Sequence, residues 1–384
     1  MNFLDKYKYH KDDPSEFNID LKDFKKNSNE LDNSHLYSNL LTNSVRVSKK
    51  ILPKVAKAIE TVFKRIEIEN NFNFFVTADN NQANASCSLM SSASRPDIVL
   101  TSRLIELLSL EELQFVIGHE VAHYVYQHAL YPNHNNVDDR NLKLNILNLS
   151  RAAEISADRI GFLACNNLDN SLRANFKLAS GLSDKNFNFK PSTYLDQLRD
   201  LEDLGKSNSE LWSTHPSFLI RMQSLIWFSM TKEYHEFFDI KKKGTYNLSE
   251  VDKKLDQKIK KVTGDELEIS NKKIYENALI WGSLDIYLSD KKFSKVEQNE
   301  FSKRFGENAN KAISLLKISR ARDMLDKKIE TSFFEASKLL KTEKNRLVEE
   351  LKTVGKETGG DKMKKLKILG KLLNILGIKK PISF

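Results

Sequence analysis

The sequence lacks the cysteines and the long apolar runs on which several protein classes depend. Its 384 residues include two cysteines, Cys87 and Cys165, so a disulfide framework and a cysteine-rich zinc module are excluded. No stretch approaches the roughly 18 consecutive apolar residues of a membrane-spanning helix. The first 17 residues contain no apolar core of a secretory signal. We therefore expect a cytoplasmic protein without a membrane anchor.

Charge is distributed unevenly along the chain. Residues 231–384 carry 35 Lys and Arg against 24 Asp and Glu, whereas residues 1–230 carry 26 against 28. This asymmetry predicts two functional units. The basic half could contact nucleic acid or an anionic membrane. A solvated, lysine-rich helical surface is the favoured interpretation, so neither contact is expected.

Composition and apolar periodicity divide the chain further. Residues 1–34 are polar and without a sustained period, which predicts a loosely held arm. Residues 35–238 are expected to form the first domain, residues 239–264 a Lys-rich linker, and residues 265–384 an all-helical domain.

The first domain is expected to be α+β and mostly helical. Three short segments read as strands of a small antiparallel sheet, because they are rich in β-branched, aromatic and alternating apolar residues and are separated by turn residues. They are residues 72–79, 83–90 and 97–102.

A metal-binding pattern lies in the helix that follows these strands. Ser109 and Glu112 form a capping box, and we expect the helix to continue to Tyr131, before Pro132. His119 and His123 are four residues apart, so both imidazoles project from nearly the same helix face and can share one zinc ion.

Glu120 follows the first histidine and points about 100° around the helix. There its carboxylate can reach a water molecule without taking a coordination position, as a general base requires. His128 lies five residues past His123, off the ligand face, and is interpreted as structural.

A catalytic zinc needs a third protein ligand. The metzincin pattern requires a glycine and a third histidine where this chain has Tyr126 and Ala129, so that class is excluded. Glu154 is the candidate instead, as in gluzincins, because it lies on a helical segment rich in small residues that lets two helices approach closely. Asp158, one turn later, is placed to accept the other ring N–H of a ligating histidine.

Three segments together resemble the M48 peptidases, the family of the CAAX prenyl endopeptidases and HtpX-type proteases. They are VIGHEVAHYVYQH (116–128), the pair Glu154 and Asp158, and STHPSFLIRMQSL (213–225). The similarity spans roughly residues 50–230 and includes an Asn-Ala pair, Asn84 and Ala85, that matches the family's edge-strand motif.

The resemblance implies a zincin-like domain with one zinc per chain and endopeptidase activity on protein or peptide substrates. The substrate would lie along the edge strand that carries Asn84 and Ala85. His215 would lie near the metal, either donating to the developing oxyanion or acting as a removable fourth ligand. Arg221 would brace the site through carboxylates. Many M48 members have membrane helices or secretory signals; because neither is expected here, membrane substrates are not carried over.

The second half resembles another family. NKKIYENALIWGSLDIYLSDKKFSKVEQNEFSKRFG (271–306) is similar to the start of a tellurite-resistance TerB-like helical domain, and LKILGKLLNILGI (366–378) to its last helix. Two functions therefore stay open: a zinc endopeptidase with Glu120 as general base, or a latent zinc-site protein that acts as a scaffold through its basic half.

Overall fold

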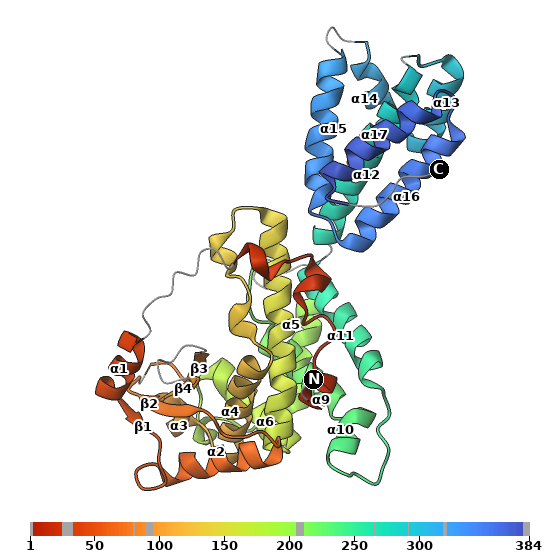
Figure 1. Ribbon diagram of the computed structural model, residues 1–384. Coiled ribbons are helices and arrows are strands. Elements are labelled where there is room, and N and C mark those ends of the chain that lie inside the picture. The colour runs from red at the N-terminus through yellow and green to blue at the C-terminus, as the bar shows by residue number, and fades with distance from the viewer. Residues whose placement is uncertain are drawn as a thin grey trace. The chain divides into compact units, whose positions relative to one another are not determined.

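The computed structural model describes residues 3–24, 34–79, 81–88, 95–204, 211–264, 266–290, 292–317 and 321–378 (Figure 1). The chain divides into two compact units, Met1–Gly264 and Asp265–Phe384. No helix within the described ranges combines the length and apolar character that a bilayer crossing requires.

The first unit contains a four-stranded sheet in the order β1-β2-β4-β3. Its strands are β1 (Ser44–Arg46), β2 (Asn73–Thr77), β3 (Ala85–Ser88) and β4 (Asp97–Thr101). The outer pairings are antiparallel, but β2 and β4 run parallel. The sheet is therefore mixed rather than antiparallel throughout, because β3 pairs with the far side of β4 and leaves β2 and β4 as neighbours. β3 lies at an edge.

The helices of the first unit supply most of the buried apolar residues of its main core. They are α1 (Ser34–Asn43), α2 (Pro53–Arg65), α3 (Ser102–Leu107), α4 (Leu110–Val125), α5 (Arg140–Cys165), α6 (Leu168–Ser180), α7 (Pro191–Asp203), α9 (Phe218–Phe228), α10 (Lys232–Phe237) and α11 (Leu248–Thr263). Short 3-10 helices add η1 (Phe3–Tyr7), η2 (Pro14–Phe17), η3 (Leu21–Asp23), η5 (His128–Leu130), η6 (His134–Asn136) and η7 (Asp184–Asn186).

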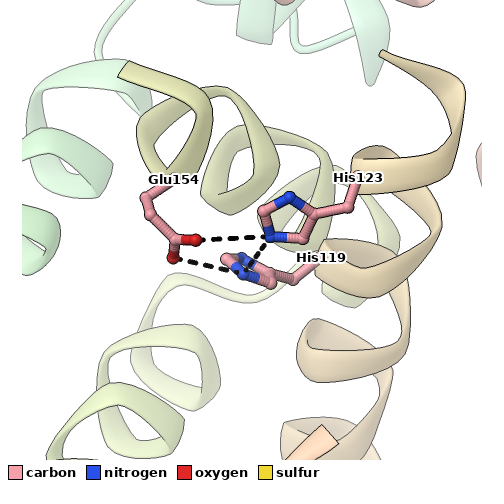
Figure 2. A group of neighbouring side chains, drawn as sticks. All are labelled: His119, His123 and Glu154. Carbon is pink, nitrogen blue, oxygen red and sulfur yellow. Dashed lines mark hydrogen bonds and ion pairs between the residues drawn. The ribbon is translucent and has the colours of Figure 1, made fainter. Parts of the chain in front are cut away.

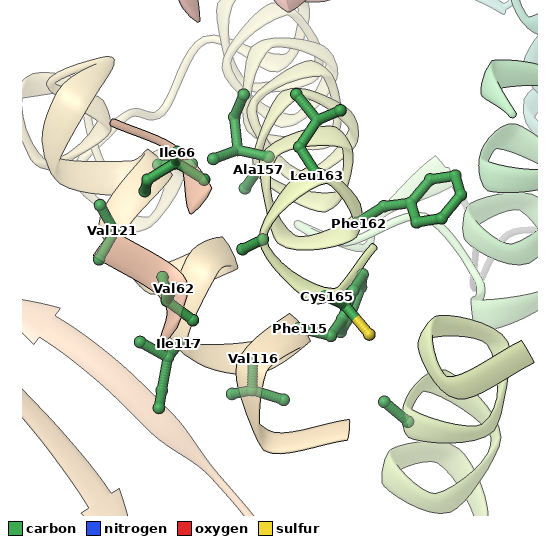
Figure 3. Close-up of a cluster of buried hydrophobic side chains, with 14 of the residues drawn as sticks. Val62, Ile66, Phe115, Val116, Ile117, Val121, Ala157, Phe162, Leu163 and Cys165 are labelled. Atoms are coloured by element: carbon green, nitrogen blue, oxygen red, sulfur yellow. The ribbon is translucent and has the colours of Figure 1, made fainter. Parts of the chain in front are cut away.

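Helix α4 is the centre of this unit. It packs against α2, α5, α6 and β3. Figure 3 shows the apolar side chains that α2, α4 and α5 contribute to one buried cluster, among them Val62, Ile117 and Leu163. α4 is thereby held on several sides, and the functional side chains that it carries have a rigid base.

The end of α4 differs from the expectation. The helix stops at Val125 rather than near Tyr131, because Gln127 adopts the left-handed conformation with φ 57°. The backbone N–H of Tyr126 still bonds to the Ala122 carbonyl, after which the chain turns into η5. His128 therefore does not continue the helical spiral.

The N-terminal segment is not the loose arm that its polar composition predicts. Leu4 and Tyr7 are fully buried in the main core, and Tyr9 and Ile19 are buried in smaller clusters. The expectation failed because these apolar residues follow no helical or strand period; they anchor short 3-10 turns instead. Residues 25–33 of the predicted arm lie outside the described residues.

The predicted linker, residues 239–264, also differs. Most of it forms α11, which packs against α7 and α9 and belongs to the first unit. Leu248, Val251, Leu255 and Val262 are buried at helical spacing, while the lysines occupy the other face. The high lysine content concealed this apolar stripe.

The second unit is all-helical within its described residues. It contains α12 (Glu266–Tyr287), η8 (Leu288–Asp290), α13 (Lys295–Phe305), α14 (Glu307–Leu315), α15 (Ala321–Ser337), α16 (Lys341–Glu357) and α17 (Lys362–Ile375). A separate apolar core, with Leu284, Phe301, Phe333 and Leu351 fully buried, holds these helices together.

Candidate metal centre

Three donor side chains converge where α4 faces α5. The Nε2 atoms of His119 and His123 lie 3.0 Å apart. The carboxylate of Glu154 lies 3.5 Å from the first ring and 3.4 Å from the second (Figure 2). One donor atom from each residue lies within 4.8 Å of the other two. Two imidazole nitrogens and one carboxylate oxygen are a ligand set that suits zinc and leaves a fourth position for water.

The local sequence explains this convergence. The capping box of Ser109 and Glu112 fixes the start of α4. The i and i+4 spacing then places both histidines on the face that meets α5. Glu154 is buried in the middle of α5, a helix of 26 residues that begins with the side chain of Asp139 as its cap.

The protonation of the two histidines differs in the absence of metal. Burial lowers the pKa of His123 to about 3, so its ring is neutral, the form that binds metal. Burial also acts to lower the pKa of His119, but hydrogen bonds to Asp158 and Glu154 outweigh it and raise the pKa to about 10. Metal binding at this cluster is therefore expected to release a proton.

Glu120 lies beside the cluster on α4 and is 8% exposed. Burial raises its pKa to about 7; the nearby charge of His119 acts in the opposite direction, and that of Glu154 in the same direction. The backbone of Cys87, on strand β3, acts to lower this pKa.

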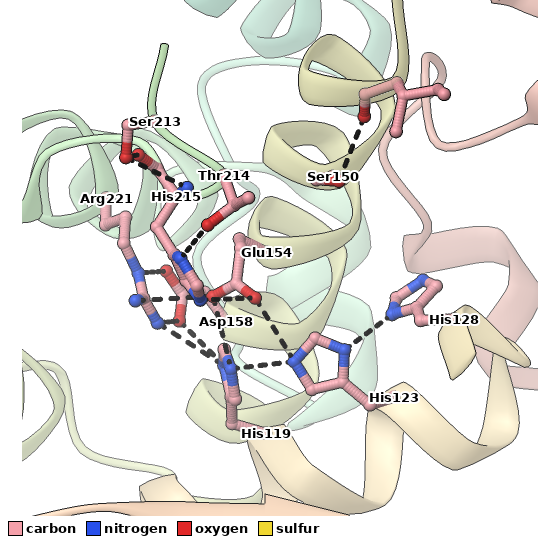
Figure 4. Close-up of polar contacts among 11 residues, drawn as sticks. His119, His123, His128, Ser150, Glu154, Asp158, Ser213, Thr214, His215 and Arg221 are labelled. Carbon is pink, nitrogen blue, oxygen red and sulfur yellow. Dashed lines mark hydrogen bonds and ion pairs between the residues drawn. The ribbon is translucent and has the colours of Figure 1, made fainter. Parts of the chain in front are cut away.

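Asp158 and Arg221 hold the cluster from the far side (Figure 4). Asp158 Oδ1 lies 3.0 Å from His119 Nδ1, the ring nitrogen that points away from the donor cluster. Arg221 donates two hydrogen bonds to Asp158, of 2.7 and 2.6 Å. Its Nη1 also lies 3.4 Å from Glu154 Oε2. Arg221 therefore joins both carboxylates of α5, the arrangement expected from the sequence.

His215 reaches the cluster from the loop before α9. Its Nε2 lies 3.3 Å from Glu154 Oε1, and its Nδ1 lies 2.8 Å from the hydroxyl oxygen of Thr214. Its side chain is 59% exposed. The buried Arg151 of α5 donates to the Ser213 carbonyl at 2.7 Å and so fixes this loop on the helix that bears Glu154.

A cavity of about 660 Å³ is lined by His119, Glu120, His123, Glu154, His215 and Arg221, but not by Asp158. Strand β3 forms one of its walls through Ala85, and Asn84, the residue directly before the strand, lines it as well. The Asn84 backbone is tied to Thr101, whose hydroxyl group accepts from the Asn84 N–H at 2.9 Å. The structure thus brings every predicted site residue to one cleft or its immediate support.

Two residues that belong to the site or support it were not predicted from the sequence. Cys87 lines the cleft and acts to lower the pKa of Glu120 through its backbone, which carries no sequence signal. Asp12 contacts His128, which in turn contacts His123. No spacing rule connects Asp12 with a partner so far along the chain. The one available sequence signal was His128 itself, which was interpreted as structural.

The comparisons with known proteins agree with this geometry. The profile of Peptidase family M48 matches residues 50–135 and 139–226, which confirms the resemblance over this region. A 171-residue segment is 26% identical to "Plastoglobule-localized metallopeptidase 48, chloroplastic" from Arabidopsis thaliana, covering 38% of this chain and 49% of that protein. The chain thus matches about half the length of this relative. No solved structure matches.

Proposed function

We propose that this chain is a zinc-dependent endopeptidase that hydrolyses peptide bonds of protein substrates, since residues 50–135 and 139–226 match the profile of peptidase family M48. One observation supports this most: two histidines and a glutamate converge within 4.8 Å, with a buried carboxylate, Glu120, beside them in the same cleft. A purely structural site has no need for that second acidic group.

His119, His123 and Glu154 would hold one zinc ion. When bound, zinc supplies Lewis acidity and lowers the pKa of a coordinated water molecule toward neutrality. The donor types fit this ion. His119 and Glu154 are buried and His123 is half-buried, so their surroundings restrict all three side chains without it.

Glu120 would act as general base and then as general acid. It accepts a proton from the attacking water and delivers it to the leaving amine. A carboxylate works best in this role when its pKa is close to the working pH. Burial raises the pKa of Glu120 to about 7, which suits the task.

The substrate would bind as an added strand on β3. An extended peptide can pair with an exposed sheet edge through main-chain hydrogen bonds. β3 is such an edge within the described sheet, and it lines the cleft at Ala85, directly after Asn84. His215 would then donate to the oxyanion that forms on the scissile carbonyl.

The test compares two variants of the full chain with a matched control. Glu120→Gln should keep stoichiometric zinc and lose about 10²–10⁴ in turnover of an unstructured peptide, the usual contribution of a general base. Glu154→Ala should lose zinc and activity together, because it removes a metal donor. Glu111→Gln makes the same chemical change at an exposed position in the first turn of α4 and should leave both unchanged.

The rival function predicts different results. A latent zinc-site protein that acts as a scaffold through residues 265–384 would bind zinc without measurable hydrolysis in the wild type. Wild-type turnover that survives Glu120→Gln would place the activity elsewhere and contradict the proposal. The resemblance of the second unit to TerB-like domains stays a prediction.

A further inference from the structure

The ring of His123 has its two nitrogens in different surroundings. Nε2 faces the donor cluster, 3.0 Å from His119 Nε2 and 3.4 Å from Glu154 Oε1. Nδ1 points away from it, 2.8 Å from Nδ1 of His128. A neutral imidazole that binds metal through Nε2 must carry its proton on Nδ1. His123 can therefore serve as a ligand only if His128 accepts that proton in a hydrogen bond.

The second contact of His128 supplies this condition. Its Nε2 lies 2.9 Å from Oδ2 of Asp12, which is 1% exposed. An ionised carboxylate only accepts hydrogen bonds, so the proton of a neutral His128 lies on Nε2. Nδ1 of His128 is then an acceptor, as His123 requires. The chain of contacts from Asp12 thus specifies the tautomer of both rings.

Asp12 is itself fixed by independent contacts. The hydroxyl group of Tyr131 donates to its other oxygen, Oδ1, at 2.8 Å. Lys8 Nζ lies 3.8 Å from the carboxylate. Three residues earlier, the backbone N–H of Tyr9 donates to Ser156 Oγ on α5 at 3.0 Å. The carboxylate is therefore held between α5 and the segment that follows α4.

The turn after α4 makes this arrangement possible. A continued helix would carry His128 away from His123, but the left-handed Gln127 redirects the chain into η5. His128 is thereby buried against His123, with the ring centroids 4.9 Å apart. Gln127 and the N-terminal segment together complete the contacts.

We propose that Asp12 and His128 are positioning residues of the metal centre, fixing the tautomer and the ring orientation of His123. The role matches that of Asp158, which contacts the outer nitrogen of His119 directly. Here the carboxylate acts through one intervening imidazole. The inference rests on the proposed zinc site and extends it to the N-terminal segment, which lies outside the region matched by the M48 family.

The test measures zinc affinity of the full chain by competition with a chelator. Asp12→Asn and His128→Phe should each weaken zinc binding by about 10–100-fold, the usual effect of losing such a partner. His128→Gln should recover part of the loss, because its amide offers both an acceptor and a donor. Asp13→Asn is the matched control: it makes the same change at the adjacent, exposed position and preserves the cap of η2.

A second measurement reports the tautomer itself. In the zinc-free protein, the ring ¹⁵N shifts of His123 should show a proton on Nδ1 in the wild type and in Asp13→Asn. In Asp12→Asn they should show a mixture of tautomers. A purely structural role for Asp12 would lower thermal stability without changing these shifts.

The outcomes are distinguishable. If the wild type binds no zinc, the zinc site itself is wrong. If the wild type binds zinc and Asp12→Asn binds it as tightly as Asp13→Asn, with unchanged ring shifts, the positioning role is wrong. Should Asp12→Asn fail to fold, the comparison of His128→Gln with His128→Phe decides: equal affinities contradict the proposal.

Discussion

Arg221 shapes the charge of the proposed metal site without being one of its three proposed donors. It lies against two buried carboxylates, those of Glu154 and Asp158. Burial acts to raise the pKa of both groups, but hydrogen bonds and charges from His119 and Arg221 lower both pKa values overall. When His119 is neutral, as a metal ligand must be, one guanidinium against two carboxylates leaves a net negative charge, which favours a bound cation.

The role of His215 can be tested at the same scale. If it donates to the oxyanion, His215→Ala should lower turnover by about 10²–10³, as for other single donors of this kind. If it is a removable fourth ligand, the same change should raise basal turnover, because the metal regains an open position. We expect the loss. His215 does not belong to the three-residue donor cluster of the described chain, although it contacts Glu154.

The measurement is hydrolysis of an unstructured peptide at equal zinc content. His235→Ala, on α10 and away from the cleft lining, is the matched control. Unchanged turnover in His215→Ala would remove this residue from the site and leave a histidine in a proline-bounded turn.

The predictability of individual site residues depended on their spacing. His119, Glu120 and His123 follow from helix geometry alone, and Glu154 follows from the need for a third donor on a neighbouring helix. Asp12 could not be predicted in this way, since its contact with His128 depends on the tertiary position of a segment without periodicity.

At the scale of elements, the metal centre depends on how closely α4 approaches α5. Gly118, next to His119, faces Gly161 and Ala164 of α5. A Cβ atom at position 118 would lie 3.1 Å from Gly161 Cα and well inside the van der Waals contact distance of Ala164 Cβ. The two glycines therefore allow the close contact that brings Glu154 to the histidines.

Gly118→Ala should consequently damage both packing and metal binding. Overpacking of this kind costs about 1–3 kcal/mol, and moving the helices apart should weaken zinc affinity as well. Thermal unfolding and chelator competition measure the two effects. Gly359→Ala is the control, because a Cβ atom there meets nothing within 4 Å. If Gly118→Ala kept wild-type stability and zinc affinity, the contact between α4 and α5 would be loose enough to accept a Cβ atom.

Elements were predicted well where the apolar period was strong and poorly where composition hid it. The capping box located the start of α4, but Gln127 ended the helix early through a backbone conformation that glutamine rarely adopts. The apolar stripe of α11 was missed because lysines dominate the composition of this segment. Long lysine side chains can lie against apolar surface while their charges stay in water.

At the scale of the whole molecule, the two units have separate cores. The main core of the first unit surrounds α4 and α5, and that of the second unit is built from α12 to α17. The proposed metal donors all belong to the first unit. Zinc binding is therefore expected to stabilise one unit and not the other.

Calorimetry of the full chain can test this expectation. A ligand that binds only the folded state at about 100 times its Kd stabilises that state by about 2.7 kcal/mol. Removing zinc with a chelator should lower the unfolding temperature of the first unit and leave the transition of residues 265–384 in place. Glu154→Ala should resemble the zinc-free wild type with or without added zinc. If the chelator lowered both unfolding temperatures alike, the expectation that zinc stabilises only the first unit would be wrong.

The docked N-terminal segment also has a consequence for biosynthesis. Residues 3–12 are made before the rest of the first unit, yet Tyr9 and His10 bond to Asp256 on α11. At a synthesis rate of about 5–20 residues per second, Asp256 is made roughly 12–50 s after this segment. A nascent chain interrupted before α11 already contains all three proposed metal donors. It still lacks α11, one of the elements that hold the segment bearing Asp12.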